Sequence, residues 1–105
     1  MNTLVSVSIF PIGEGEELSQ YVAEVIKVIE ASGLPSRTTA MATEIEGEWD
    51  AVMKTVKDAT FVLAEKGCRT IVTFKADIRP GHSNTLNTKV EKIDKILGEN
   101  RGSAK

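Results

Sequence analysis

The chain has 105 residues, of which 41% are hydrophobic and 27% are charged, and these proportions are typical of one soluble globular domain. Thirteen basic residues against 15 acidic ones give a net charge of −2, which disfavours nucleic acid as a partner. The single cysteine excludes an internal disulfide, and no stretch has the character of a signal peptide or a membrane span. We therefore expect a cytoplasmic protein with no membrane partner.

The hydrophobic pattern predicts a strand, a helix and a short hairpin in the first half of the chain. Residues 4–10 alternate β-branched and serine side chains, which is typical of a strand with one buried face. Apolar residues spaced by three and four follow from Glu16, and they predict a helix that Gly33 ends. Two threonine-rich runs, 36–41 and 43–47, predict a tight hairpin or one bent strand pair.

The second half contains a further helix and strand and then a last helix. The spacing predicts a helix from about 49 to 66, an alternating strand over 69–78 and a helix from about 85 to 97. The order β-α-β-β-α-β is that of the ferredoxin-like fold, an α+β architecture in which two helices cover one face of a four-stranded antiparallel sheet. We expect a single domain over residues 1–98 and a frayed tail over 99–105.

This topology leaves the second face of the sheet uncovered. Alternation places these residues under the helices: Val5, Val7, Ile9, Val72 and Phe74. It places these on the open face: Ser6, Ser8, Thr73, Lys75 and Asp77. Such a face is either solvated or covered by a second subunit, where it can trap a small polar ligand. Phe61 points away from the buried stripe of its helix and favours a subunit contact.

Residues that carry enzyme chemistry are sparse in this chain. The only histidine, His82, lies in a predicted turn, and Cys68 stands where a strand begins, where we expect a buried, unreactive thiol. Gly13 and Gly15 flank an acidic residue and form no phosphate-binding loop. No cysteine lies near enough to Cys68 to complete a zinc site. We therefore expect no catalysis and no cofactor.

A polar cluster follows the hairpin. Gly47 permits a tight turn from strand to helix, and Glu48 or Asp50 is expected to serve the start of the helix. Capping leaves Glu46 unexplained, because it is a carboxylate within a strand, near the hydroxyl of Thr43. Glu46 is therefore a candidate for binding.

Three segments together resemble the thiamine-binding protein family, also called YkoF-like. They are residues 5–13, 41–50 and 75–79, and the resemblance extends over about 3–97. Its most specific piece is the Thr-x-x-Glu-Gly core that begins at Thr43. The resemblance implies a ferredoxin-like domain that assembles into dimers or tetramers through its sheets. It also implies binding of thiamine, or its hydroxymethylpyrimidine portion, without catalysis.

The motif positions that match the family are Thr43, Glu46, Gly47, Asp77 and Arg79. An aminopyrimidine presents donors and acceptors side by side, so a carboxylate of Glu46 or Asp77 can accept from its amino group while Ser8 or Thr43 supplies a hydroxyl. The expected ligand-binding residues are Ser8, Thr43, Glu46, Asp77 and Arg79. No basic cradle for a pyrophosphate is evident, and we expect unphosphorylated ligands to bind better.

Two other interpretations stay open. In the first, the chain is a protein–protein assembly module without a small-molecule ligand, and its open sheet and Phe61 serve subunit contacts alone. In the second, it is an enzyme with a carboxylate-based mechanism that uses Glu46 and Asp77. Turnover of a thiamine-related compound would be needed to support the second.

Overall fold

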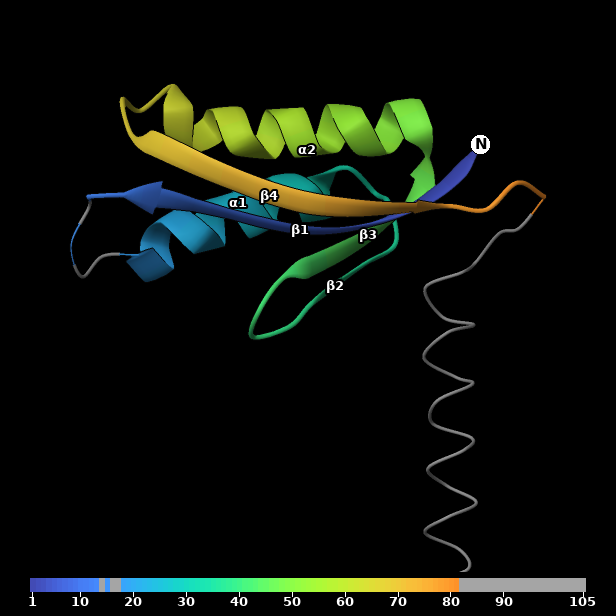
Figure 1. Ribbon diagram of the computed structural model, residues 1–105. Coiled ribbons are helices and arrows are strands. Elements are labelled where there is room, and N and C mark those ends of the chain that lie inside the picture. The colour runs from blue at the N-terminus through green and yellow to red at the C-terminus, as the bar shows by residue number, and fades with distance from the viewer. Residues whose placement is uncertain (14, 16–17, 82–105) are drawn as a thin grey trace, which may run out of the picture.

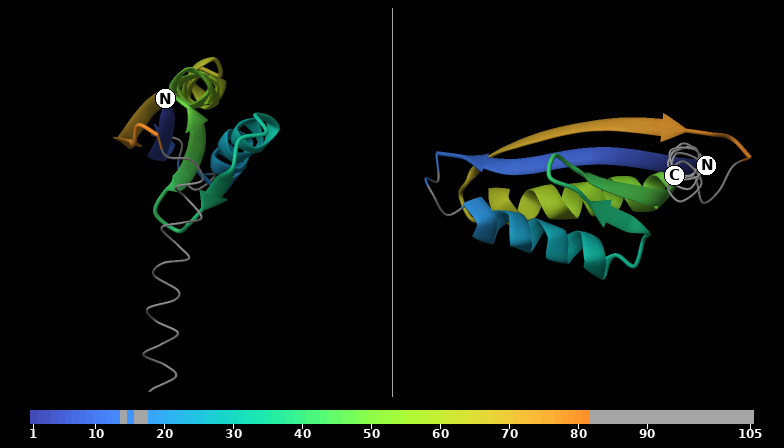
Figure 2. Two further views of the ribbon diagram at one scale, coloured as in Figure 1. Left: turned by 90° about the vertical axis from the view of Figure 1, so that its right-hand side faces the viewer. Right: turned by 90° about the horizontal axis from the view of Figure 1, so that it is seen from below.

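The computed structural model describes residues 1–13, 15 and 18–81, and it confirms the predicted order of strands and helices. The elements are β1 (Asn2–Ile12), α1 (Leu18–Ala31), β2 (Ser36–Thr38), β3 (Thr43–Glu48), α2 (Trp49–Ala64) and β4 (Arg69–Ile78). The strands form one antiparallel sheet in the order β2-β3-β1-β4, and both helices cover the same face of it (Figure 1, Figure 2). This is the ferredoxin-like α+β fold. The helix predicted near 85–97 and the tail at 99–105 lie outside the described residues.

The core lies between the helices and the sheet. Alternation along β1 directs Val5, which is 0% exposed, and Val7, which is 2% exposed, toward the helices. Ile29 of α1 and Leu63 of α2 meet these strand residues in one cluster. The apolar stripe of each helix is therefore what fixes its place on the sheet.

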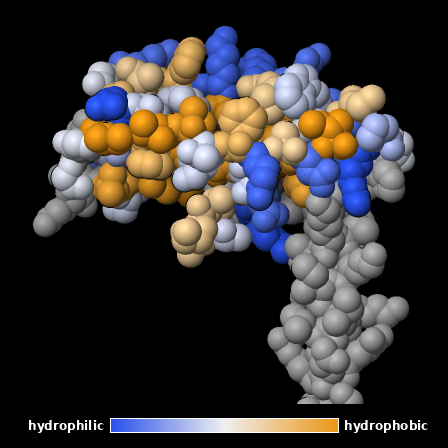
Figure 3. Space-filling view, in the orientation of Figure 1, coloured by the Kyte–Doolittle hydropathy of each residue, from blue (hydrophilic) through white to orange (hydrophobic). Residues whose placement is uncertain are grey.

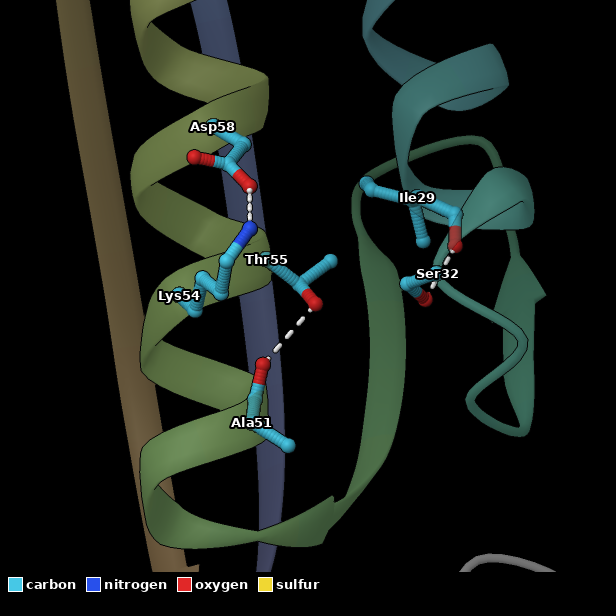
Figure 4. A network of polar contacts seen from close by, with 6 residues as sticks. All are labelled: Ile29, Ser32, Ala51, Lys54, Thr55 and Asp58. Atoms are coloured by element: carbon cyan, nitrogen blue, oxygen red, sulfur yellow. Dashed lines mark hydrogen bonds and ion pairs between the residues drawn. The ribbon is translucent and has the colours of Figure 1, made fainter.

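Polar contacts between residues close in the sequence lie along α2 and at the end of α1 (Figure 4). Thr55 is buried, and its hydroxyl donates to the carbonyl of Ala51, 2.9 Å away, so no partner outside the helix is needed. Lys54 and Asp58 form an ion pair of 2.6 Å on the surface of α2. Phe61 is 47% exposed on the same helix, which confirms that it points away from the core.

The start of α2 differs from the sequence prediction. Glu48 occupies the N-cap position, but its side chain makes no capping hydrogen bond. Its carboxylate pairs instead with the ammonium group of Met1, so the expectation that Glu48 caps the helix is wrong. Asp50 lies in the first turn, where the helix dipole favours a negative charge.

The helices cover the centre of the sheet more fully than its β4 margin. Pairing with Val7 and Ile9 places Phe74 and Val72 on the helix-facing side, as alternation predicts. Yet Val72 is 39% exposed and Phe74 is 46% exposed. The expectation that both are buried under the helices is wrong, because β4 is the end strand of the sheet.

Candidate functional site

The uncovered face of the sheet is arranged in rows that cross the strands. In one row Ser6 of β1 lies between Glu44 of β3 and Lys75 of β4. In the next row along β1, Ser8 lies opposite Thr73. Ser6, Ser8 and Glu44 are half-buried. Hydroxyl groups therefore occupy the centre of this face, with an acidic group on one side and a basic group on the other.

The row centred on Leu4, two residues before Ser6 in β1, contains two of the predicted carboxylates. Leu4 pairs with Glu46 on one side and with Asp77 on the other. Glu46 is only 3% exposed, and its Oε2 accepts a hydrogen bond of 2.8 Å from the side-chain Nδ2 of Asn2. The backbone N–H of Arg79 donates to the carbonyl of Asn2, 3.4 Å away. The structure thus brings Glu46, Asp77 and Arg79 to one end of the open face.

A shallow hollow of about 440 Å³ lies on the open face beside this carboxylate row. It is lined by Ser6, Ser8, Ala42, Thr73, Phe74 and Lys75. Its volume lies within the range of about 300–1,000 Å³ that small-molecule sites occupy. Ser8 is four positions after Leu4, or about 13 Å away along the strand. Ser8 therefore does not lie next to Glu46 or Asp77, whereas Ser6 lies one row away from them.

Thr43 lies on the other side of the sheet. It pairs with Val7, whose side chain points to the helices, and it is 8% exposed. Its hydroxyl oxygen lies 3.2 Å from that of Thr38 on the neighbouring strand. The structure therefore does not place Thr43 with Glu46 and Asp77, and its nearest polar contact is within the hairpin.

A second, smaller cavity of about 160 Å³ opens where the pairing of β1 with β3 ends. Its walls are apolar side chains of β1 and α1 together with the hairpin loop, and its lining includes Ser8, Val22, Ile26, Thr39, Met41 and Thr43. Sequence reasoning missed this cavity. The run of small and hydroxyl-bearing residues over 38–43 was its signal, because such a run cannot fill the space beside a strand edge.

Gly47 has a packing role in the Thr-x-x-Glu-Gly segment. A Cβ atom at this position would lie 3.0 Å from Cδ2 of Leu34 and 3.4 Å from Cγ2 of Val52. Glycine therefore lets Leu34, in the loop between α1 and β2, and Val52 of α2 pack closely against β3. Gly47 therefore contributes to packing beneath the sheet and does not line the open face.

The described residues supply few groups for catalysis. Within residues 1–13, 15 and 18–81, no three histidine, cysteine or acidic side chains lie together as a metal site. Cys68 is buried, as predicted, and is 8% exposed. In the same part of the chain, no helix has both the length and the apolar character needed to cross a membrane. What the open face offers is hydroxyl groups and charges, which suit binding.

Comparison with known proteins decides the family. The sequence profile described as "Thiamine-binding protein" matches residues 5–94. The chain belongs to the thiamine-binding protein family. Among its relatives, the UPF0045 protein Mb1933 of Mycobacterium bovis is 39% identical over 98 residues, which are 92% of this chain and 96% of that protein.

Solved structures show the same fold in members and neighbours of this family. The crystal structure of the hypothetical protein MJ1052 from Methanocaldococcus jannaschii has a TM-score of 0.80 and 32% identity, and covers 89% of this chain and 96% of that one. The crystal structure of TM0486 from Thermotoga maritima, described as a "putative thiamine biosynthesis/salvage protein", has a TM-score of 0.78. It is 23% identical over 89% of this chain and 99% of its own, so it supports the fold alone.

Proposed function

We propose that this protein binds thiamine, or a related hydroxymethylpyrimidine metabolite, without catalysis, as an oligomeric carrier or sensor in the cytoplasm. Membership of the thiamine-binding family supports the ligand class. The observation that carries the location is the hollow of about 440 Å³ on the open face, which lies on the same sheet face as Glu46 and Asp77. The cavity of about 160 Å³ is below the usual size range of such sites.

The residues of this face match the donors and acceptors of an aminopyrimidine. Asp77 lies diagonally across from Ser6, because Leu4 pairs with Asp77 and Ser6 pairs with Lys75. Diagonal neighbours in a sheet are about 7–8 Å apart at Cα, a separation that a flat heterocycle can bridge. The carboxylate of Asp77 accepts from the amino group of the pyrimidine, and the hydroxyl of Ser6 bonds to a ring nitrogen.

The charges of the face favour a cation at its carboxylate end. Glu46 and Asp77 lie two residues from the Ser6 row, and Glu44 lies within it. A thiazolium ring is positively charged, so we place it toward these carboxylates and away from Lys75. Arg79, at the same end, is the group that limits how much positive charge the site accepts.

A shallow hollow leaves much of a ligand in solvent, whereas binding sites for small molecules bury most of the ligand surface. We therefore propose that a second copy covers the open face when the ligand is bound. Phe10 and Ile12 are 39% and 41% exposed. Alternation along β1 places both on the open face, where they provide apolar contacts for that second copy. Two single chains stacked through their open faces give a dimer, and two dimers stacked in the same way give a tetramer.

A thermal-shift titration tests the proposal. Thiamine, thiamine diphosphate and hydroxymethylpyrimidine are titrated at fixed protein concentration, because ligand that binds only the folded state adds RT ln(1 + [L]/Kd) of stability. We expect a saturable rise in Tm with thiamine, and its loss in Asp77→Asn. The matched control is Asp50→Asn, which makes the same chemical change at an exposed position in the first turn of α2. A cooperative transition that none of the compounds moves would refute ligand binding and favour an assembly module.

A further inference from the structure

Three donors of the hollow on the open face have no role in the proposed contacts to thiamine. They are the hydroxyls of Ser8 and Thr73 and the ammonium group of Lys75. Ser8 lies opposite Thr73, and Lys75 follows Thr73 by two residues, or about 7 Å, on the same face of β4. A lysine carries its ammonium group on a flexible four-carbon stem, which is long enough to span that separation. The three groups can therefore reach one point in the hollow.

The two hydroxyls lack the internal partners that most hydroxyls of this chain have. Among the threonines of the described residues, Thr73 alone makes no side-chain hydrogen bond. The others that do so are Thr3, Thr38, Thr39, Thr43, Thr55, Thr60 and Thr70. The hydroxyl of Ser8 likewise has no partner within this part of the chain. Both hydroxyls are therefore available to a molecule that enters the hollow.

Lys75 carries a charge that no carboxylate of the described residues neutralises in an ion pair. By contrast, Lys54 and Lys66 each form an ion pair with a carboxylate. Glu44 lies in the same row as Lys75, but on the far side of β1, where the register places Arg37 opposite it. An anion that enters the hollow beside Lys75 therefore meets a cation without a competing partner.

We propose that Lys75, Ser8 and Thr73 bind one phosphoryl group, either as inorganic phosphate or as the phosphate of a monoester. Phosphate carries acceptor oxygens on all sides, so it can accept from two hydroxyls and an ammonium group at once. Lys75 is the only cation among the described residues that line the hollow, which limits the site to a single phosphoryl group. Asp77 repels an anion, but it lies four residues from Thr73, or about 13 Å along the strand.

The surroundings of Lys75 strengthen its attraction for an anion. Phe74 also lines the hollow and is 46% exposed. Figure 3 shows a hydrophobic band along the side of the molecule on which β4 lies. Opposite charges attract more strongly beside apolar groups than in bulk water, because the effective dielectric constant is lower there. This anion subsite goes beyond the proposed function, since none of its contacts requires thiamine.

A titration of the full chain with inorganic phosphate, without thiamine, tests the subsite. Backbone amide resonances of isotope-labelled protein are followed by NMR while phosphate replaces chloride at constant pH and ionic strength. We expect saturable shifts of the amide resonances of Ser8 and Thr73. Lys75→Gln should raise the Kd of phosphate about tenfold and Thr73→Val about threefold, because each removes a donor to a charged acceptor and the first also removes a charge.

Two matched controls make the same chemical changes elsewhere. Lys27→Gln removes an exposed lysine of α1. Thr70→Val removes a hydroxyl of β4 that already donates to the carbonyl of Cys68, 3.0 Å away. Both should leave the Kd of phosphate unchanged. The absence of a saturable shift, or an equal loss of binding in Lys27→Gln and Lys75→Gln, would overturn the proposal in protein that still melts cooperatively.

A phosphate ester of hydroxymethylpyrimidine distinguishes the two sources of the phosphoryl group. If the subsite takes the phosphate of a monoester, the ester should bind more tightly than hydroxymethylpyrimidine, and Lys75→Gln should remove the difference. If it takes free phosphate, the two compounds should bind equally, and phosphate should bind while thiamine occupies the hollow. Phosphate binding in a protein that does not respond to thiamine would support the subsite and refute the proposed function, so the two failures are distinguishable.

Discussion

Gly47→Ala adds one methyl group at the tightest glycine contact of the described chain. The new Cβ atom would lie 3.0 Å from Cδ2 of Leu34. That separation is about 0.5–1 Å shorter than the optimum for two carbon atoms. Overpacking costs about 1–3 kcal/mol, and the half-buried side chain of Leu34 can move, so we take about 1.5 kcal/mol.

Part of this cost is offset in the unfolded state. Alanine has less conformational freedom to lose than glycine, which favours the variant by about 0.5 kcal/mol. The expected net loss for Gly47→Ala is therefore about 1 kcal/mol, or a Tm lower by about 4–8 °C in a domain of this size. In a Leu34→Ala background the close contact is absent, and Gly47→Ala should become neutral or slightly stabilising.

The original protein, Gly47→Ala, Leu34→Ala and the double variant form a double-mutant cycle. Urea denaturation of these four proteins, followed by circular dichroism at fixed protein concentration, gives the coupling energy. We expect about 1.5 kcal/mol between positions 47 and 34. Gly67→Ala is the control, since Gly67 has a φ of +85° and no atom within 4 Å of a Cβ at that position. Its cost is backbone strain and should be the same in both backgrounds. A Gly47→Ala cost that Leu34→Ala does not reduce would refute the packing explanation.

Two further predictions concern α2 and the hollow. Leu63→Ala is expected to destabilise the protein by about 2–5 kcal/mol, because Leu63 is 0% exposed. Phe61 lies only two residues away but is 47% exposed, so Phe61→Ala should cost under about 1 kcal/mol. Chemical denaturation measures both, and equal losses would contradict the assignment of the two helix faces. Lys75→Ala removes the cation that lines the hollow and should tighten thiamine binding about twofold while weakening that of thiamine diphosphate. Calorimetry with both ligands measures this, and a parallel change for the two would contradict the charge argument.

The fold was predictable because its periodicities are strong and local. Residues 69–78 alternate so regularly that the predicted and observed bounds of β4 coincide. The spacing of three and four in α2 likewise reflects a stripe that ends in Leu63. What the pattern does not contain is how far each helix reaches across the sheet, so it could not show that Phe74 would be left exposed at the margin.

The site was less predictable because it depends on pairing between distant strands. Thr43 and Glu46 are three residues apart in one strand, and an odd spacing directs their side chains to opposite faces. That separation could have been read from the sequence. By contrast, Glu46 and Asp77 meet on either side of Leu4 only because β1 pairs with both β3 and β4 in one register.

This separation of faces allows a direct test of where the ligand binds. Ser6 lines the hollow on the open face and not the small cavity, whereas Thr43 lines the small cavity and not the hollow. Ser6→Ala should therefore weaken thiamine binding about tenfold, since a lost hydrogen bond is worth about 0.5–1.5 kcal/mol and more where a partner is left unsatisfied. Thr43→Val keeps the shape of the side chain and should leave the Kd of thiamine unchanged.

The opposite result has an equally definite meaning. If Thr43→Val weakened binding and Ser6→Ala did not, the ligand would lie against the free edge of β1, between α1 and the hairpin. The carboxylates of Glu46 and Asp77 would then be too far along the sheet to contact the pyrimidine, since Val7, the partner of Thr43, is three residues from Leu4, or about 10 Å along the strand. Asp77→Asn would in that case also leave binding intact, so the three variants together distinguish the two cavities without a structure of the complex.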